Sequence, residues 1–112
     1  MNRWDVYWAD VPFDEDKTQI KRRPVIIVKD EEVYVLVIRM TSHEARTYDP
    51  YDYTLQKWQF AGLEKASVVR IRKISLLKPE SIYDFIGKIH PIDILEIQKR
   101  MFRYQKERIS CR

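Results

Sequence analysis

The chain has 112 residues and a mass of 13.7 kDa, enough for one domain with a single core and too little for two. An apolar content of 45%, with 12% aromatic residues, excludes a disordered chain. The net charge of +4 is small, but two basic stretches within residues 17–29 and 65–78 border predicted strands and favour a surface for an anionic partner. The single cysteine, Cys111, excludes an internal disulfide and a cysteine-based zinc site, and no apolar run reaches the length of a membrane span. We therefore expect a soluble, cytosolic protein whose residues 1–112 form one domain.

The N-terminal segment predicts a strand followed by a long polar loop. Residues Trp4–Val11 are rich in aromatic and β-branched side chains, and this pattern stops at Pro12. The loop over residues 12–22 is polar and charged, and it is longer than the ~2–5 residues of an ordinary hairpin connection. Because long loops on small domains often carry function, this loop is a candidate for ligand contact.

The next two segments predict a β-hairpin. Pro24 opens the first strand, where its missing N–H is tolerated, and residues Val25–Val28 are apolar without interruption. A charged turn at residues 29–32 leads into Val33–Met40, which is apolar on both faces. We expect this second strand to lie in the centre of the sheet or beneath a partner subunit.

Shorter segments predict the rest of the sheet. We expect strands at Tyr53–Leu55, Ser67–Ile71 and Ile82–Ile89, because each is short and rich in aromatic or β-branched residues. Gly62 suits a turn, and Gly87 suits a bend within the last strand.

The C-terminal segment predicts an amphipathic helix over residues 91–108. Pro91 suits the first helical position, and basic residues in the second half of the segment complement the helix dipole. Apolar residues recur at steps of three and four positions, at Ile94, Ile97, Met101 and Tyr104. Several short strands followed by one helix predict a mainly β fold, a small and strongly bent antiparallel barrel with the helix against it.

Arg23 is the strongest candidate for chemistry. A guanidinium at a strand start offers five donors in a fixed fork and binds phosphate through two of them. Pro24 restricts Arg23 to an extended backbone, so Arg23 is better placed than Arg22, which we expect to act as a supporting charge. The competing interpretation, favoured by composition alone, is an ion pair between Arg23 and the acidic block at residues 10–16.

Hairpin geometry brings a hydroxyl group to the same place. If the two hairpin strands pair through residues 30–32, Arg23 and Thr41 fall at the same end, within a few ångströms of each other. Together they could orient a phosphorane-like transition state and stabilise its charge. His43 is the candidate proton carrier at that end, although a lone histidine there is more often solvated, and Thr41 could bond only to its own turn. His90 precedes the helix and suits a cap, and no histidine spacing indicates a zinc site.

The chain as a whole resembles the MazF/PemK family of toxins from toxin–antitoxin modules, and its PemK-like subgroup in particular. The resemblance rests on the order and spacing of five segments that span nearly the whole chain: WDVYWADVPF, KRRPVIIV, VIRMTSH, AGLEKASVVRIRKI and IGKIHPIDILEIQKRM. It implies an SH3-like barrel with a C-terminal helix, a homodimer, and a metal-independent, sequence-specific endoribonuclease that needs no cofactor.

The resemblance also implies a mechanism and a set of site residues. Such enzymes cut single-stranded RNA with the RNA's own 2′-OH, leaving a cyclic phosphate and a 5′-OH, and Arg23 and Thr41 match the family's arginine and threonine. The loop at residues 14–22 matches the loop that contacts RNA, and an antitoxin with an acidic C-terminal segment covers the same groove. The candidate RNA contacts are Lys17, Thr18, Gln19, Lys21, Arg22, Ser42 and Arg70.

The chain departs from the family pattern at three places. Trp4 stands where a glycine is common, the loop at residues 14–22 contains no glycine, and Arg72 lies in a region that is often acidic. Two other functions remain open on the sequence: a non-catalytic, SH3-like module that binds nucleic acid or an acidic peptide, and a toxin of the same fold that poisons a protein target such as a topoisomerase. The intact pair of Arg23 and Thr41 disfavours the second.

Overall fold

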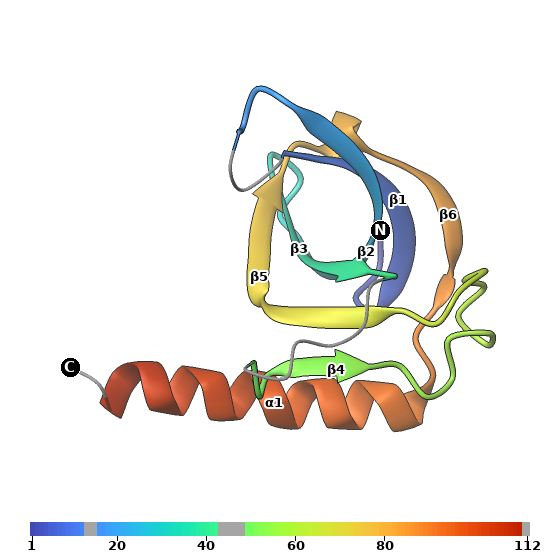
Figure 1. Cartoon of the computed structure of the whole chain (residues 1–112). Coiled ribbons are helices and arrows are strands. Elements are labelled where there is room, and N and C mark those ends of the chain that lie inside the picture. Colours follow the sequence, from blue (N-terminus) through green and yellow to red (C-terminus); the bar gives the residue numbers. More distant parts are fainter. Residues whose placement is uncertain (13–15, 43–48, 111–112) are drawn as a thin grey trace.

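A curled antiparallel sheet with one long helix beneath it forms the molecule (Figure 1). The computed structural model describes residues 1–12, 16–42 and 49–110, with the backbone alone for Ser110. The elements in chain order are β1 (Asp5–Pro12), β2 (Ile20–Asp30), β3 (Val35–Thr41), β4 (Asp52–Thr54), β5 (Val68–Leu77), a short 3₁₀ helix η1 (Pro79–Ser81), β6 (Ile82–Lys88) and α1 (Pro91–Ser110).

The six strands form one sheet in the order β4-β5-β3-β2-β1-β6, and every neighbouring pair is antiparallel. Bending of this sheet gives the small barrel that the sequence predicts, although β4 and β6 end the sheet as unpaired edges within the described ranges. Strand β3 lies in the middle, between β5 and β2, which explains why its sequence is apolar on both faces.

The β2–β3 hairpin is confirmed, but β2 begins earlier than predicted. It starts at Ile20 rather than at Pro24, and Pro24 lies inside the strand opposite Trp8 of β1. Pairing with β3 begins only at Val25, so Pro24 lies where β2 has a neighbour on one side alone. Its missing N–H therefore removes no hydrogen bond to β3. Because β2 starts at Ile20, the loop predicted over residues 12–22 is shorter than expected.

Strand β5 is longer than the predicted Ser67–Ile71. It continues to Leu77 because its second half pairs with β3, with Leu36 opposite Leu76 and Val35 opposite Leu77. The charged residues at 72 and 73 interrupt the apolar pattern of the sequence but not the ladder of the sheet. The bend expected at Gly87 is present as a shift in the β1–β6 register beside that residue.

Two clusters of buried side chains lie on opposite faces of the sheet, as the alternation of residues along each strand requires. One cluster contains Val25, Ile27, Val35 and Val37. The other contains Ile26, Ile38 and Met40 and is covered by α1, which contributes Ile97 as a fully buried side chain. Both ends of the hairpin are therefore fixed by packing on two sides.

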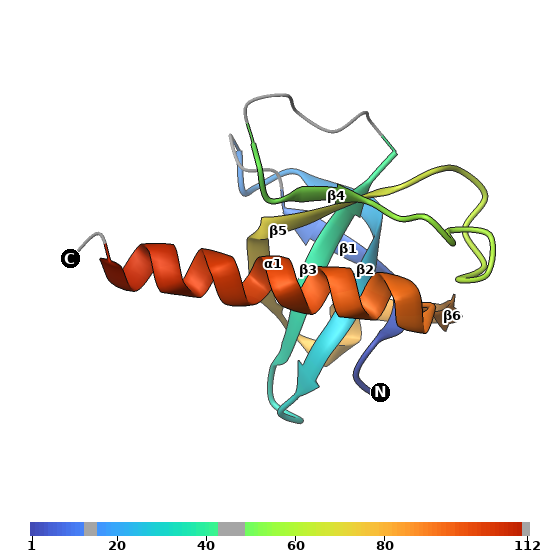
Figure 2. The same ribbon diagram turned by 90° about the horizontal axis from the view of Figure 1, so that it is seen from below.

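Helix α1 runs across the side of the barrel, next to β4 and β5 (Figure 2). It begins at Pro91, as predicted, and Ile94, Met101 and Tyr104 pack against the core around Ile97. His90 caps the helix, since its Nδ1 accepts a hydrogen bond from the N–H of Ile92 at 3.0 Å. Within the described ranges, no helix combines the length and the apolar character needed to cross a membrane.

Trp4 occupies a position that favours glycine. Its φ is +73°, in the left-handed region that a bulky residue rarely adopts. Two backbone hydrogen bonds hold it there: its N–H donates to the carbonyl of Ile27 at 2.8 Å, and its carbonyl accepts from the N–H of Ile89 at 3.0 Å. A tryptophan thus occupies a left-handed backbone position that a glycine would adopt without strain.

Candidate active site

The β2–β3 hairpin brings Arg23 and Thr41 into contact. The register pairs Val25 with Arg39, and continuing it by two residues places Arg23 opposite Thr41. Nη1 of Arg23 donates a hydrogen bond to Oγ1 of Thr41 at 3.5 Å, and Thr41 is buried while Arg23 is half-buried. The predicted cation and hydroxyl therefore lie side by side at one end of the hairpin.

A second guanidinium approaches the pair from β5. Arg70 follows Val68 and Val69, which pair with Thr41 and Met40 across the β3–β5 ladder. Nε of Arg70 forms an ion pair with Oδ1 of Asp52 at 3.4 Å, and the Asp52 side chain is only 1% exposed. This carboxylate holds Arg70, one of the predicted RNA contacts, next to the pair. The sequence did not predict a role for Asp52.

The two guanidiniums influence each other. Burial, and then the positive charge of Arg70, lower the pKa of Arg23 below its ordinary value. Guanidinium groups nonetheless stay charged in proteins, so the site holds two cations near each other in a partly desolvated place. A phosphate between them would relieve this repulsion, which makes the arrangement suited to an anion.

Arg22 leaves β2 on the opposite face from Arg23, because neighbouring residues of a strand alternate between faces, although both side chains reach the same groove. Its guanidinium lies over the ring of Trp8, 4.4 Å from the centroid, and also 5.5 Å from the centroid of Tyr83. It forms an exposed ion pair with Asp84 at 3.6 Å. Arg22 thus takes part in an aromatic and cationic stack beside the site.

The competing interpretation for Arg23 is an ion pair with the acidic block at residues 10–16. No such ion pair of Arg23 is seen among the residues that the structure places.

A groove of about 310 Å³ lies next to the pair. It brings together three of the predicted residues, Arg22, Arg23 and Ser42. The rest of its lining comes from β1, β2, β6 and the loop before β5: Trp8, Pro24, Gly62, Leu63, Glu64, Lys65, Ser67 and Ile86. The sequence predicted none of these eight as site residues, because they meet only once the sheet has curled.

The predicted loop residues lie outside this groove. Lys17, Thr18 and Gln19 are exposed between β1 and β2, and Lys21 is exposed on β2 opposite Val11. The Thr18 hydroxyl donates to Oδ1 of Asp16 at 2.6 Å, and this bond lowers the pKa of Asp16. These side chains therefore do not line the groove.

Two predictions concern histidine and metal. His43 lies outside the residues that the structure describes, and His90 is the cap of helix α1. No group of three or more His, Cys, Asp or Glu side chains that could hold a metal ion occurs in the described part of the chain.

The family of the chain follows from its sequence. Residues 2–103 match the model of the PemK-like, MazF-like toxins of type II toxin–antitoxin systems. The chain belongs to this toxin family. A comparison with curated protein sequences finds no match.

Solved structures share the fold of this MazF-like toxin at low sequence identity. An endoribonuclease from a mycobacterial species, in complex with its cognate antitoxin, is 18% identical with a TM-score of 0.65, and 90% of each chain is covered. The Mycobacterium tuberculosis toxin MazF-mt6 is 17% identical with a TM-score of 0.63, covering 85% of this chain and 91% of that one. The MazE–MazF structure from Deinococcus radiodurans is 14% identical with a TM-score of 0.67, covering 94% of each. These likenesses confirm the barrel with its C-terminal helix.

Proposed function

We propose that this toxin is a metal-independent, sequence-specific endoribonuclease that cleaves single-stranded RNA. The observation that carries the proposal is the contact between the Arg23 guanidinium and the Thr41 hydroxyl, beside a groove with further cations. The name of the mycobacterial protein, an endoribonuclease with the same fold, supports it.

The proposed reaction uses a nucleophile that the RNA carries itself. The 2′-oxygen forms a bond to the neighbouring phosphorus and the bond to the 5′-oxygen breaks, which leaves a 2′,3′-cyclic phosphate and a 5′-OH. Negative charge grows on the non-bridging oxygens, where Arg23 donates hydrogen bonds, while Thr41 orients the scissile phosphate. A base must take the proton of the 2′-OH and an acid must protonate the leaving oxygen. Arg23 is too weak a base for the first task, and His43 stays the candidate for this proton transfer.

We further propose the partners of this toxin. An antitoxin with an acidic C-terminal segment would cover the groove, because its carboxylates would satisfy the same cations as RNA; the cognate antitoxin of the mycobacterial protein supports this. A homodimer would bury apolar side chains that α1 leaves exposed, among them Leu95, Phe102 and Ile109. The cytoplasm, where single-stranded RNA occurs, is the proposed compartment.

The test is cleavage of a long single-stranded RNA in EDTA, with the new 5′ ends mapped and their hydroxyl or phosphate state determined. We expect discrete cuts with 5′-OH ends from the wild type. Arg23→Ala and Thr41→Ala should abolish them, whereas the exposed controls Arg103→Ala and Thr54→Ala should cut as the wild type does. Binding of RNA without cleavage by the wild type would overturn the nuclease and favour a binding module.

A further inference from the structure

The groove beside Arg23 has the form of a binding site for a flat, partly polar group. Trp8, Pro24 and Ile86 give its lining apolar and aromatic surface, and the loop from Gly62 to Lys65 also lines it. We propose that this groove holds one nucleobase next to the phosphate at Arg23, and that Glu64 selects bases that carry an amino group. The proposal rests on nucleic acid as the ligand of the site, as in the proposed function, but not on cleavage.

The wall of the groove is fixed against β6 by two glycines. A Cβ on Gly87 would lie 2.2 Å from the carbonyl oxygen of Ala61, and a Cβ on Gly62 would lie 2.6 Å from that of Ile86. Gly62 also has a φ of +87°, which side chains rarely adopt. Only glycine at both positions lets the loop and the strand approach so closely, and this contact sets the position of the loop.

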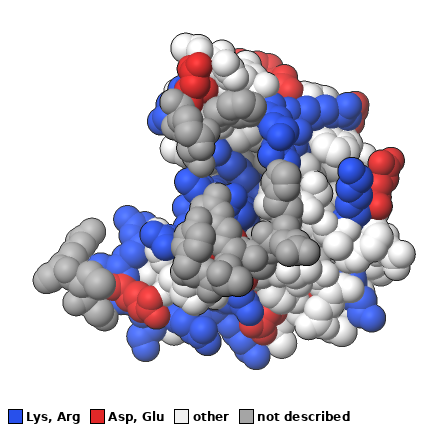
Figure 3. Space-filling model, viewed as in Figure 1, with Lys and Arg blue, Asp and Glu red and all other residues white. Residues whose placement is uncertain are grey.

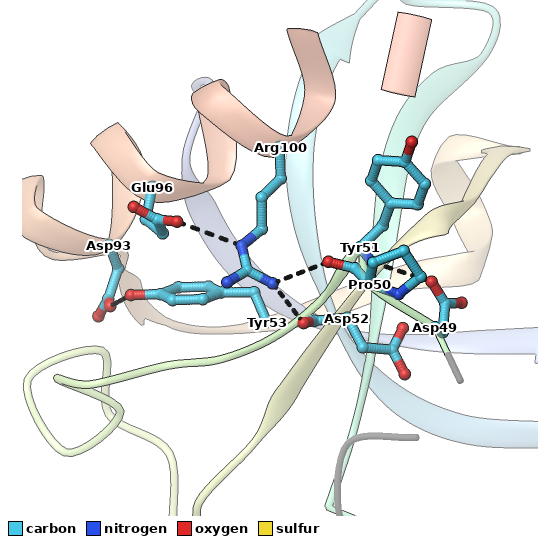
Figure 4. A network of polar contacts seen from close by, with 8 residues as sticks. All are labelled: Asp49, Pro50, Tyr51, Asp52, Tyr53, Asp93, Glu96 and Arg100. Atoms are coloured by element: carbon cyan, nitrogen blue, oxygen red, sulfur yellow. Dashed lines mark hydrogen bonds and ion pairs between the residues drawn. The ribbon is translucent and has the colours of Figure 1, made fainter. Parts of the chain in front are cut away.

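The start of the same loop is fixed to helix α1. Asp93, 1% exposed in the first helical turn, accepts hydrogen bonds from the backbone N–H groups of Gln56 and Lys57, both at 2.9 Å. It also accepts one from the hydroxyl of Tyr53 at 2.5 Å (Figure 4). Burial, and then this bond, raise the pKa of Tyr53, so its hydroxyl stays a donor.

Arg100 completes the anchoring from the same helix. Its Nη1 donates to the carbonyl of Asp52 at 2.6 Å and to that of Pro50 at 3.3 Å, while its Nε pairs with Glu96 at 3.3 Å (Figure 4). The loop is thus held at β4, at α1 and at β6 before any ligand arrives. A preorganised wall reduces the entropy that binding must overcome.

The chemistry of the lining favours a base. Proteins bind unpaired bases by stacking on aromatic rings and on guanidinium planes, and the stack of Arg22 on Trp8 borders the groove. Arg23 lines the same groove and would bind the phosphate of the same nucleotide. Base and phosphate would therefore be held by neighbouring parts of one site.

Glu64 supplies the selectivity. Among the described residues it is the one acidic side chain of the lining, it is exposed, and it makes no hydrogen bond or ion pair with any residue that the structure places. A carboxylate accepts hydrogen bonds but donates none. Cytosine presents an N4 amino donor where uracil presents an O4 acceptor, so Glu64 should favour cytosine over uracil.

Equilibrium binding of uncleavable oligonucleotides tests the subsite separately from catalysis. We would measure fluorescence anisotropy of labelled pentamers of deoxycytidine and of deoxyuridine with the wild type, Glu64→Gln and Glu80→Gln. Glu80 is an exposed carboxylate of η1 outside the groove, and Glu64→Gln keeps the size of the side chain while its amide can also donate.

We expect the wild type and Glu80→Gln to bind the cytosine pentamer about 10-fold more tightly than the uracil pentamer, and Glu64→Gln to lose this preference. A wild type without preference, or a Glu64→Gln variant that keeps it, would overturn the subsite. If the preference depends on Glu64 but RNA is not cut, the subsite stands and the nuclease fails. If RNA is cut and Glu64→Gln changes no preference, the nuclease stands and the subsite fails.

Discussion

The contact between Arg23 and Thr41 is long for a hydrogen bond, at 3.5 Å, and this length is informative. It engages one of the five N–H donors of the guanidinium and only weakly. Most of the donors of Arg23 therefore stay available for a phosphate, while Thr41 lies directly beside the guanidinium. The rest of the hairpin, packed on both faces, keeps the two residues in register.

Arg23→Lys tests whether the shape of this cation matters as well as its charge. Lysine keeps the positive charge but loses the fork that binds two phosphate oxygens. We expect single-turnover cleavage of RNA to slow by roughly 100-fold, as for loss of a donor to a charged transition state. Arg103→Lys, on the exposed side of α1, is the matched control. A rate for Arg23→Lys within a factor of about three of the wild type would show that charge alone suffices.

Asp30 gives a prediction for the pH dependence of stability. Oδ1 of Asp30 accepts a hydrogen bond from the N–H of Glu32 at 2.9 Å, and this bond is the main cause that lowers the pKa of Asp30 from 3.8. Because the folded-state pKa is below the unfolded value, the contribution to stability is present above pH 3.8 and is lost as the pH falls through the folded value. The free energy of unfolding should therefore decrease less on acidification in Asp30→Asn than in the wild type.

Urea unfolding of both proteins between about pH 2.5 and 6 measures this difference. Glu107→Gln, exposed on α1, serves as the control for loss of one carboxylate. If the free energy of unfolding depends on pH equally in Asp30→Asn and in the wild type, the hydrogen bond to Glu32 does not stabilise the folded state relative to the unfolded state.

At the scale of the elements, the contact between β6 and the loop before β5 decides how the groove is built. Gly87→Ala places a methyl group against the backbone of Ala61, and neither backbone can yield without moving a strand. We expect a loss of about 2–3 kcal/mol in the free energy of unfolding, as for overpacking at a rigid site. Chemical denaturation is the measurement, with Ala66→Ser in the exposed part of the same loop as the control. A loss below about 0.5 kcal/mol would mean that the loop moves aside easily.

Local pattern was enough to predict the hairpin and the helix, because their signals lie within one short segment. Pro91, the apolar steps from Ile94 to Tyr104, and the charged turn between the hairpin strands each act over a few residues. The start of β2 and the end of β5 could not be predicted in this way. Their ladders depend on partners far along the chain, and pairing overrides the charges at residues 72 and 73.

Of the residues at the candidate site, some could be brought together from local pattern and others could not. Arg23 and Thr41 could be placed together from the sequence, since two strands joined by a short turn fix which ends meet. Asp52 and Glu64 could not, because they reach the site from β4 and from the following loop through the curl of the whole sheet. No local pattern distinguishes these two acids from the other carboxylates of the chain.

At least one face of the whole molecule is rich in basic side chains. Lys and Arg gather along α1 and over the middle of the barrel in the face drawn in Figure 3, and the net charge of the chain is +4. Binding of a polyanion to such a surface releases counterions, which makes the affinity depend on salt.

We expect the affinity for a short single-stranded RNA to fall roughly 10- to 20-fold between 50 and 200 mM salt, as for about three neutralised phosphates. Arg23→Ala should reduce the slope of log affinity against log salt by about 0.7, the share of one phosphate. Anisotropy at four or five salt concentrations measures both quantities, and Thr54→Ala is a neutral control. An affinity that is independent of salt would contradict phosphate binding at this surface.

If RNA is cut by its own 2′-OH at Arg23 and Thr41, one substitution in the substrate should prevent cleavage. A synthetic RNA with a mapped cut would carry a single 2′-deoxy nucleotide on the 5′ side of the scissile phosphate, and its cleavage would be followed in EDTA beside the unmodified RNA. We predict that the modified RNA stays intact at that position and still binds, because only the nucleophile is missing. Cleavage at the modified position would contradict the account, since the attacking oxygen would then come from elsewhere.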